Sequence, residues 1–427
     1  MDIFILFSVL LFLMLIGLPV TFSMGISATY FLWVTDQFQL AAMLPLQMVV
    51  GLEHYGLMAI PMFYFAGAVM TTSGLTARLL DFARVLIGRV PGSLSKVNIA
   101  GSMFFAGVSG SCTADTSAIG SVMIPAMKKE GYSSAYAAAV TAASSTIGHI
   151  IPPSIVMIII GVMMELPIGQ LFLAGALPGF LLGLALIAIS YWLSIKRGYP
   201  RAERFATASE ILQVTVRSLS ALAMPIIVIG GILLGVVTVT ETGVIAFLYA
   251  VLVSFFYREM SLEELWGLIV QTSQGAGTLL ILIAPASFFS WVVVTTGMGQ
   301  DLVDLITSIT TNAHLVMLLM IVFLLIIGCA LDTVGMIFIF VPVLFPLAEA
   351  VGIDPLQFAP VFTLCLGIAL LTPPVGIILF MVTNMSKAPL TEVIREIRPF
   401  FIAQLLVLGL VAYVPFISTW LPSFASN

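Results

Sequence analysis

The sequence predicts an all-α polytopic membrane protein made of two inverted-topology repeats, and three observations support this fold class. Of its 427 residues, 61% are hydrophobic and 8% are charged, whereas a soluble domain carries about 25% charged residues. The apolar runs are long and continuous, which indicates helices rather than the alternating strands of a membrane barrel. Small patterns of Gly, Pro and Asp also recur in the same order in both halves of the chain. We expect about ten transmembrane spans and two re-entrant helical hairpins.

The internal repeat follows from matched residues at nearly constant separation. Pro152-Pro153 in the first half is matched by Pro373-Pro374 in the second. The stretch from Cys112 to Asp115 resembles the stretch from Cys329 to Asp332 at nearly the same separation, and a proline follows each aspartate after ten residues. Matches in one order at one period indicate a duplicated unit. We therefore predict a first repeat over residues 1–205 and a second over 206–427.

The distribution of Lys and Arg predicts how each repeat is oriented in the membrane. Lys and Arg mark cytoplasmic loops, and placing all 15 of them on one side requires a hairpin near 95–130 that opens on that side. The matching hairpin near 313–351 is flanked by acidic residues and no nearby Lys or Arg, so it opens on the opposite side. A broken helix follows each hairpin, near 133–165 and 355–386. This topology places both termini in the periplasm.

The remaining predicted spans are apolar stretches long enough to cross the bilayer as helices. They are predicted near 3–18, 20–35, 54–72, 168–195, 216–236, 240–257, 266–296 and 399–420. Amphipathic segments at 71–95 and 295–313 are expected to lie in the membrane interface. Inverted repeats with broken helices are typical of secondary transporters, whose sites lie at the bilayer midplane.

The candidate site residues lie at the hairpin tips and helix breaks. Hydroxyls and freed carbonyls at such breaks suit Na⁺, whereas half-helix N-termini suit an anion. The predicted Na⁺ ligands are Gly107, Ser109, Ser111, Thr146, Gly328, Asp332, Thr333, Gly335 and Thr372. The predicted substrate-binding residues are Ser111, Asp115, Pro152, Pro153, Ser154, Pro373, Pro374 and Gly376. Two or more Na⁺ ions and no organic cofactor are expected.

Other interpretations of these residues stay open at this point. Pro and Gly could merely kink packed spans, with Ser and Thr satisfying backbone groups. Asp115 and Asp332 could ligate a cation or cap the second helix of each hairpin, and the two roles are compatible. His149 is more simply a packed, neutral side chain.

The motifs closely resemble the large membrane subunit (DctM type) of the tripartite ATP-independent periplasmic (TRAP) transporters. The resemblance rests on three runs: Gly107 to Thr116, Ile150 to Ser154, and Leu371 to Gly376. It covers essentially the whole chain. The stretch Thr238-Val-Thr240-Glu241 departs from the family, whose members commonly have a proline after the first threonine.

The resemblance implies a bacterial inner-membrane, Na⁺-coupled importer of carboxylates or acidic sugars with an elevator-type fold. It implies a small membrane subunit (DctQ type) and a periplasmic substrate-binding protein (DctP type) as partners. It assigns Ser109, Ser111 and Thr146 to a first sodium region. It assigns Asp332, Thr333, Gly335 and Thr372 to a second.

Two competing functions remain. A stand-alone sodium–anion symporter of the same architecture would need no partner protein. An intramembrane aspartyl protease would need two carboxylates close enough to share a proton, and the chain lacks the Gly-x-Gly-Asp context of such enzymes. The sequence has no basic tail for nucleic acid, and its three cysteines show no metal-ligand spacing. We therefore expect a transporter in the lipid bilayer and not an enzyme.

Overall fold

A computed structural model describes residues 2–201, 207–233 and 235–424, and these residues form helices and connecting loops without a strand. Seven of the helices are long and apolar enough to cross a membrane, and six further apolar helices are shorter. The predicted class, an all-α polytopic membrane protein, is confirmed. The predicted boundary between residues 205 and 206 lies outside the described residues.

The first half of the chain contains ten α-helices and three short 3-10 helices within the described residues. They are α1 (Asp2–Leu15), α2 (Val20–Val34), η1 (Phe38–Met43), α3 (Leu44–Leu52), η2 (Tyr55–Met58), α4 (Ala59–Thr72), α5 (Leu75–Ile87), α6 (Ser93–Ser109), α7 (Cys112–Lys129), α8 (Ser134–Ser145), η3 (Thr146–His149), α9 (Ile155–Met163) and α10 (Ile168–Arg197).

The second half repeats most of this order. Its helices are α11 (Ala208–Leu233), α12 (Val239–Phe256), α13 (Leu262–Thr295), α14 (Met298–Ile309), α15 (Ala313–Gly328), α16 (Thr333–Ala350), α17 (Pro355–Ala369), α18 (Ile377–Ser386), α19 (Leu390–Tyr413), α20 (Phe416–Thr419) and η4 (Pro422–Phe424). Helices α6 and α7 form one hairpin and α15 and α16 the other. The broken helices are α8–η3–α9 and α17–α18.

The two Pro-Pro pairs, each of which contains a cis peptide bond, give the alignment of the two halves. Residues occupy equivalent structural positions when they are separated in sequence by the same distance as Pro152 and Pro373. At that spacing, Ser111 and Asp332 are the N-caps of α7 and α16, and Ser133 and Asp354 are the N-caps of α8 and α17. The match of Asp115 with Asp332 is therefore wrong by one helical turn, because the structural counterpart of Asp332 is Ser111.

One difference between the halves affects a predicted span. The second half has a single 34-residue helix, α13, where the first half has α3, a break at residues 53–54, and α4. The predicted span at 54–72 left out α3, which packs along α13. Gly51 permits this contact, because a Cβ at this position would lie 2.3 Å from the Cβ of Ser287.

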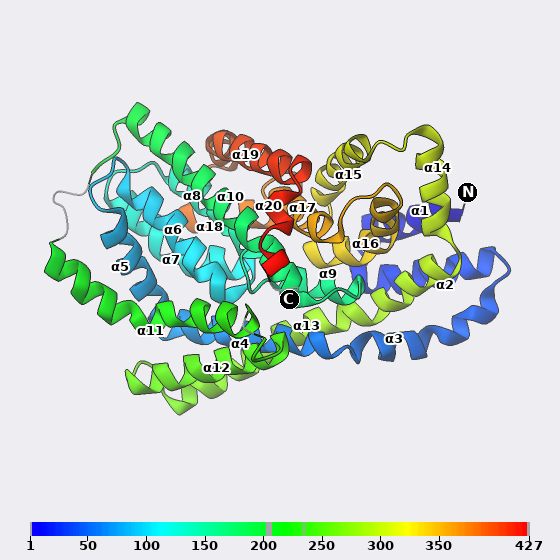
Figure 1. Cartoon of the computed structure of the whole chain (residues 1–427), viewed down its shortest axis with the longest axis horizontal. Coiled ribbons are helices and arrows are strands. Elements are labelled where there is room, and N and C mark those ends of the chain that lie inside the picture. The colour runs from blue at the N-terminus through cyan, green and yellow to red at the C-terminus, as the bar shows by residue number, and fades with distance from the viewer. Residues whose placement is uncertain (1, 202–206, 234, 425–427) are drawn as a thin grey trace.

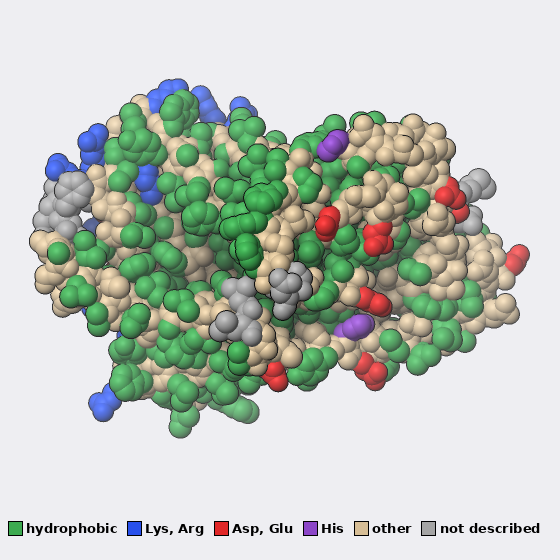
Figure 2. Space-filling model, viewed as in Figure 1, with side chains coloured by type: hydrophobic (Ala, Val, Ile, Leu, Met, Phe, Trp, Pro, Cys, Tyr) green, Lys and Arg blue, Asp and Glu red, His purple; other side chains and the backbone are tan. Residues whose placement is uncertain are grey.

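Charged side chains gather at opposite ends of the molecule. Lys and Arg lie at one end of the long axis, and most visible Asp and Glu lie toward the other (Figure 2). The short helix α5 and the open end of the α6–α7 hairpin lie toward the basic end, whereas α14 and the open end of the α15–α16 hairpin lie toward the acidic end (Figure 1). The two hairpins therefore enter from opposite sides, as expected of inverted repeats.

Candidate ion and substrate site

The tip of the first hairpin is tied to the break in the first broken helix. Gly110, between α6 and α7, has φ +60°, and its carbonyl accepts a hydrogen bond of 3.2 Å from the N–H of Ile155. A Cβ at Gly110 would lie 2.6 Å from the carbonyl oxygen of Pro153. The tip and the Pro-Pro loop therefore touch through backbone alone.

The second half repeats this tie. The carbonyl of Cys329, at the tip of the second hairpin, accepts a hydrogen bond of 3.2 Å from the N–H of Val375, which follows the second Pro-Pro pair. A Cβ on Gly328 would lie 2.6 Å from that of Ala369. Gly376, with φ +31°, is the N-cap of α18. Each half thus brings together a hairpin tip and a helix break, as the sequence predicts.

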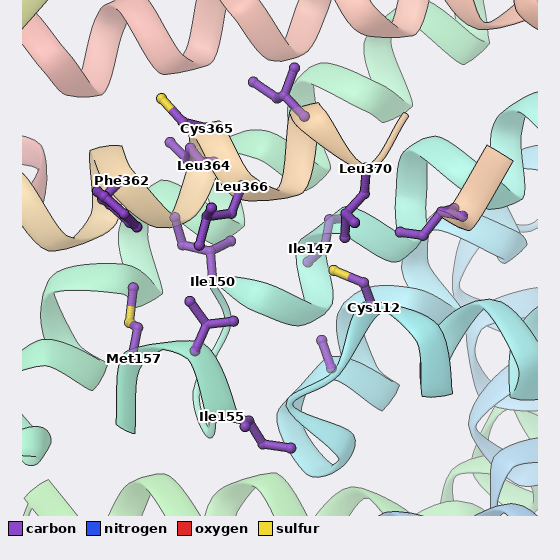
Figure 3. Packing of buried hydrophobic residues seen from close by; sticks show 14 of the residues in the cluster. Cys112, Ile147, Ile150, Ile155, Met157, Phe362, Leu364, Cys365, Leu366 and Leu370 are labelled. Atoms are coloured by element: carbon purple, nitrogen blue, oxygen red, sulfur yellow. The ribbon is translucent and has the colours of Figure 1, made fainter. Parts of the chain in front are cut away.

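The two broken helices meet in the interior of the protein. A Cβ on Gly367 of α17 would lie 3.3 Å from the Cβ of Thr146 at the break after α8. Buried apolar side chains fill the space beside this contact, with Ile147 and Ile150 of the first half near Leu366 and Leu370 of the second (Figure 3). The two candidate regions are therefore parts of one packed unit.

In the first region, several hydroxyl oxygens surround the hairpin tip. Ser109 is buried and its Oγ has no hydrogen-bond partner. The Oγ of Ser111 caps α7 by accepting a hydrogen bond from the N–H of Ala114, and it lies 3.0 Å from Oγ1 of Thr113. Thr146 donates to the carbonyl of Ala143 at 2.8 Å. Oxygen atoms of this kind suit a hard cation such as Na⁺.

In the second region, Asp332 caps a helix. Its Oδ2 accepts hydrogen bonds of 3.1 Å from the N–H groups of Val334 and Gly335, while Thr333 opens α16. The hydroxyl of Thr372 donates to the carbonyl of Ile368 at 3.1 Å. Asp332 therefore caps α16, which is one of the two roles predicted for it. Its second oxygen, Oδ1, takes no part in the cap.

The substrate candidates have different surroundings. Pro152, Pro153 and Ser154 are buried, whereas Pro373 and Pro374 are exposed. Ser154 caps α9 through a 3.2 Å hydrogen bond from the N–H of Met157. Asp115 is fully buried.

A cavity of about 510 Å³ lies between the first hairpin, α4 and α13. The hairpin contributes Ser109, Thr113 and Ser117 to its lining. The other walls include Tyr64 and Thr71 of α4 and Gln271 and Thr272 of α13. Along the hairpin the cavity runs from the tip at Ser109 toward the basic end of the molecule. At the tip it is closed by Gly67 of α4, whose added Cβ would lie 3.2 Å from the Cα of Ser109.

Sequence reasoning missed Gln404 of α19. This fully buried side chain donates from Nε2 to the carbonyl of Ala143 at 3.0 Å and to Oγ1 of Thr146 at 2.9 Å. Gln404 therefore orients a predicted Na⁺ ligand from the other half of the chain. A lone amide in an apolar run was a usable signal, because polar groups inside a membrane are costly, but nothing in the sequence indicates its partner.

Replacing Gln404 by leucine is expected to weaken the apparent Na⁺ affinity of transport by about tenfold, because the loss of a buried hydrogen-bond donor costs about 1–3 kcal/mol and frees Thr146 to rotate. Gln357→Leu is the matched control. Gln357 is also buried and donates to two carbonyls, but these belong to Val411 and Ala412 at the end of α19 rather than to the site. Equal Na⁺ dependence of uptake in the two variants would contradict a positioning role for Gln404.

Two inverted repeats, each with a re-entrant hairpin tied to a broken helix, define a secondary transporter of the membrane. Comparisons with known proteins specify the family. A family model described as "Tripartite ATP-independent periplasmic transporter, DctM component" matches residues 7–417. The chain belongs to this TRAP transporter family.

Relatives of known name agree with this family. The chain is 35% identical over 413 residues to the sialic acid TRAP transporter large permease protein SiaM of Vibrio cholerae, with 96% of each chain covered. It is 35% identical to the C4-dicarboxylate TRAP transporter large permease protein DctM of Pseudomonas aeruginosa, with 87% of each covered. Its fold is similar to the crystal structure of the Alcanivorax borkumensis YdaH transporter, with a TM-score of 0.65, 14% identity, and 91% and 90% of the two chains covered.

The family settles two of the open questions. The chain is a large permease of a bacterial inner-membrane transporter and not an enzyme, so the aspartyl protease interpretation is wrong. TRAP large permeases work with a periplasmic binding protein and usually with a small membrane subunit.

Proposed function

We propose that this permease couples inward movement of Na⁺ to the import of a carboxylate or acidic-sugar substrate. The observation that carries the proposal is the paired arrangement of hairpin tip and broken helix, which gathers hydroxyl and carbonyl oxygens in each half. The first region offers Ser109, Ser111 and Thr146, and the second offers Asp332, Thr333 and Thr372. Two such regions support at least two Na⁺ ions per substrate.

The proposed substrate is an anion that binds near the hairpin tip. Helices α7 and α9 both begin there, and helix N-termini favour negative charge. The cavity beside Ser109 has several hydroxyl and amide groups in its walls and no charged residue among those that line it, so it offers hydrogen bonds to a polar ligand. The relatives named for sialic acid and C4-dicarboxylates support a carboxylate.

The proposed transport movement is an elevator motion of the hairpin-bearing helices against a scaffold formed by α1–α4 and α11–α13. Small residues at the contact support sliding. The hairpin faces Gly67 of α4, and a Cβ on its own Gly107 would lie 3.1 Å from Pro225 of α11. The cavity extends toward the Lys- and Arg-rich end, so we assign this conformation to the state open to the cytoplasm, with both termini periplasmic.

The proposed partners are a separate small membrane subunit and a periplasmic binding protein that delivers the substrate. The experiment that tests the whole proposal measures uptake of radiolabelled carboxylates and acidic sugars into proteoliposomes under an imposed Na⁺ gradient, with all three components present. We expect uptake only with inward Na⁺ and with the binding protein. Uptake indifferent to Na⁺ would overturn the coupling, and full activity of the permease alone would favour a stand-alone symporter.

Cysteine accessibility tests the orientation of the cavity. Ser117→Cys, in a chain whose partly exposed Cys329 is replaced by serine, is expected to react with a membrane-impermeant maleimide from the cytoplasmic side, because Ser117 is exposed and lines the cavity. Thr116→Cys is the neighbouring control, since Thr116 has no exposed surface and is not among the residues that line the cavity. Faster labelling of Ser117→Cys from the periplasmic side would reverse the assignment.

A further inference from the structure

We propose that Tyr64 and Gln271 form a substrate-binding wall on the scaffold, which holds the carboxylate of the substrate only in the conformation open to the cytoplasm. This wall sets the substrate affinity of the release step and leaves the affinity on the periplasmic side unchanged. The inference deepens the proposed function, on which it rests, because it assigns residues to one side of the proposed transport cycle.

The first step of the argument is the position of the two side chains. Tyr64 of α4 and Gln271 of α13 both line the cavity of about 510 Å³ beside the first hairpin. A Cβ added to Gly275 would lie 3.4 Å from the hydroxyl oxygen of Tyr64, and Gly275 follows Gln271 by about one helical turn, on the same face of α13. The phenol and the amide therefore lie along one wall, across the cavity from the hairpin.

The second step is the hydrogen-bonding capacity that remains free around the cavity. The hydroxyls of Thr71 and Thr72 donate to carbonyls of their own helix, and that of Thr113 is paired with a neighbouring serine hydroxyl. Within the described residues, the side chains of Tyr64 and Gln271 have no hydrogen-bond partner. Because polar side chains inside membrane helices are costly and usually functional, these two free donors indicate a polar ligand.

The third step is the chemistry of that ligand. A carboxylate accepts hydrogen bonds and cannot donate them, and none of the described residues that line the cavity is charged. It must therefore take its hydrogen bonds from neutral donors. The hairpin offers the hydroxyls of Ser109 and Ser117, and the scaffold adds the phenol of Tyr64 and the amide N–H groups of Gln271. Hydrogen bonds to an ionised acceptor are stronger than neutral ones, so the scaffold donors contribute measurably to affinity.

The dependence on conformation follows from the proposed elevator movement. The hairpin carries its own hydroxyls when it moves, whereas α4 and α13 stay in place. The substrate therefore leaves the phenol and the amide behind when the carrier turns to the periplasm. Changes to these two side chains should alter substrate affinity on the cytoplasmic side alone.

The internal repeat places a second amide at the equivalent position of the scaffold. At the spacing that relates the proline of α4 to the proline of α13, the counterpart of Gln271 is Gln47 of α3. Helix α3 packs on α13 at Gly51, as α13 receives the Tyr64 ring at Gly275. Because the repeats are inverted, Gln47 belongs to the opposite side of the membrane. An amide at the same place in each half indicates that each side has its own scaffold contact.

The test measures how substrate inside the vesicle inhibits uptake. Proteoliposomes with the complete transporter are loaded with increasing concentrations of unlabelled sialic acid or succinate, and the initial uptake of the same labelled acid is recorded. We expect Gln271→Leu to raise the internal concentration for half-inhibition by about tenfold, which corresponds to about 1.4 kcal/mol, and Tyr64→Phe to raise it by about threefold. The external concentration of substrate-loaded binding protein for half-maximal uptake should stay the same.

Gln271→Glu separates ligand binding from packing. Glutamate keeps the size and polarity of glutamine but repels an anionic substrate, so this variant should need a higher internal concentration for half-inhibition than Gln271→Leu. Gln274→Leu is the matched control, because Gln274 is an exposed amide of the same helix that is not among the residues lining the cavity. It should match the wild type in both measurements.

Three outcomes overturn the proposal. One is wild-type inhibition from inside in both Gln271→Leu and Gln271→Glu. Another is an equal loss of affinity on both sides of the membrane, which would place Gln271 in a site that the substrate occupies in both conformations. The third is a wild-type transporter that neither acid inhibits from inside. The proposed function fails separately, if wild-type uptake does not depend on an inward Na⁺ gradient.

Discussion

Gly110→Ala is expected to reduce substrate uptake by at least about tenfold while the protein still inserts in the membrane. Two costs add at this position. The backbone has φ +60°, and the left-handed conformation costs an alanine roughly 1–2 kcal/mol. The new Cβ would also lie 2.6 Å from the carbonyl oxygen of Pro153 and 3.1 Å from the nitrogen of Ile155. These are backbone atoms, so the tip itself must move.

That movement breaks the hydrogen bond between Ile155 and Gly110, which is the tie that holds the hairpin tip to the helix break. Each loss of about 1.4 kcal/mol from the active arrangement corresponds to about tenfold in rate. The measurement is Na⁺-driven uptake in proteoliposomes, with the melting temperature recorded in parallel.

Gly131→Ala is the matched control for backbone strain. Gly131 also has a positive φ, +89°, but no atom lies within 4 Å of an added Cβ. It therefore has the conformational cost without the collision. If both variants transported equally well, contact between the tip and the Pro-Pro loop would not matter for function.

The parts of this site that could be predicted from the sequence depend on local chemistry. Glycine at a hairpin tip and paired prolines in a helix mark breaks wherever they occur. This is why Gly107, Pro152-Pro153 and Pro373-Pro374 indicated the first hairpin and the two broken helices correctly. The distribution of Lys and Arg then oriented the halves without any knowledge of contacts.

The sequence-based alignment of the two halves was less accurate, because it matched identical residue types rather than residues with the same structural role. An N-cap needs a side-chain oxygen, and serine and aspartate both provide one. The cap of α7 is Ser111 and that of α16 is Asp332, so the two aspartates that look equivalent have different tasks. Asp332 caps a helix, whereas Asp115 is buried one turn further along, where the second half has Met336.

Contacts between distant segments could not be predicted from the sequence. Helix α3 packs on α13 because Gly51 fits against Ser287, which lies in the other half of the chain. Gln404 reaches Thr146 across the interface of the two repeats. Neither pairing leaves a periodic or motif signal, since each depends on how whole helices pack.

Asp332→Asn is expected to separate capping from ion binding at the second hairpin. Asparagine caps helices about as well as aspartate, so the hydrogen bonds from Val334 and Gly335 persist and the stability should change by less than about 0.5 kcal/mol. If Asp332 also ligates Na⁺ with its free oxygen, loss of the charge should raise the Na⁺ concentration for half-maximal uptake by about tenfold or more, a coupling of about 1.4 kcal/mol.

Asp332→Ala and Asp354→Asn complete this comparison. The alanine variant loses the cap as well, which costs about 1 kcal/mol, so its melting temperature should fall along with its uptake. Asp354 caps α17 with a 2.7 Å hydrogen bond from the N–H of Leu356, but it lies at the loop between α16 and α17, away from the hairpin tip. Asp354→Asn should therefore transport like the wild type. Wild-type Na⁺ dependence in Asp332→Asn would leave Asp332 with a capping role alone and move the second Na⁺ to Thr333, Thr372 and the freed carbonyls.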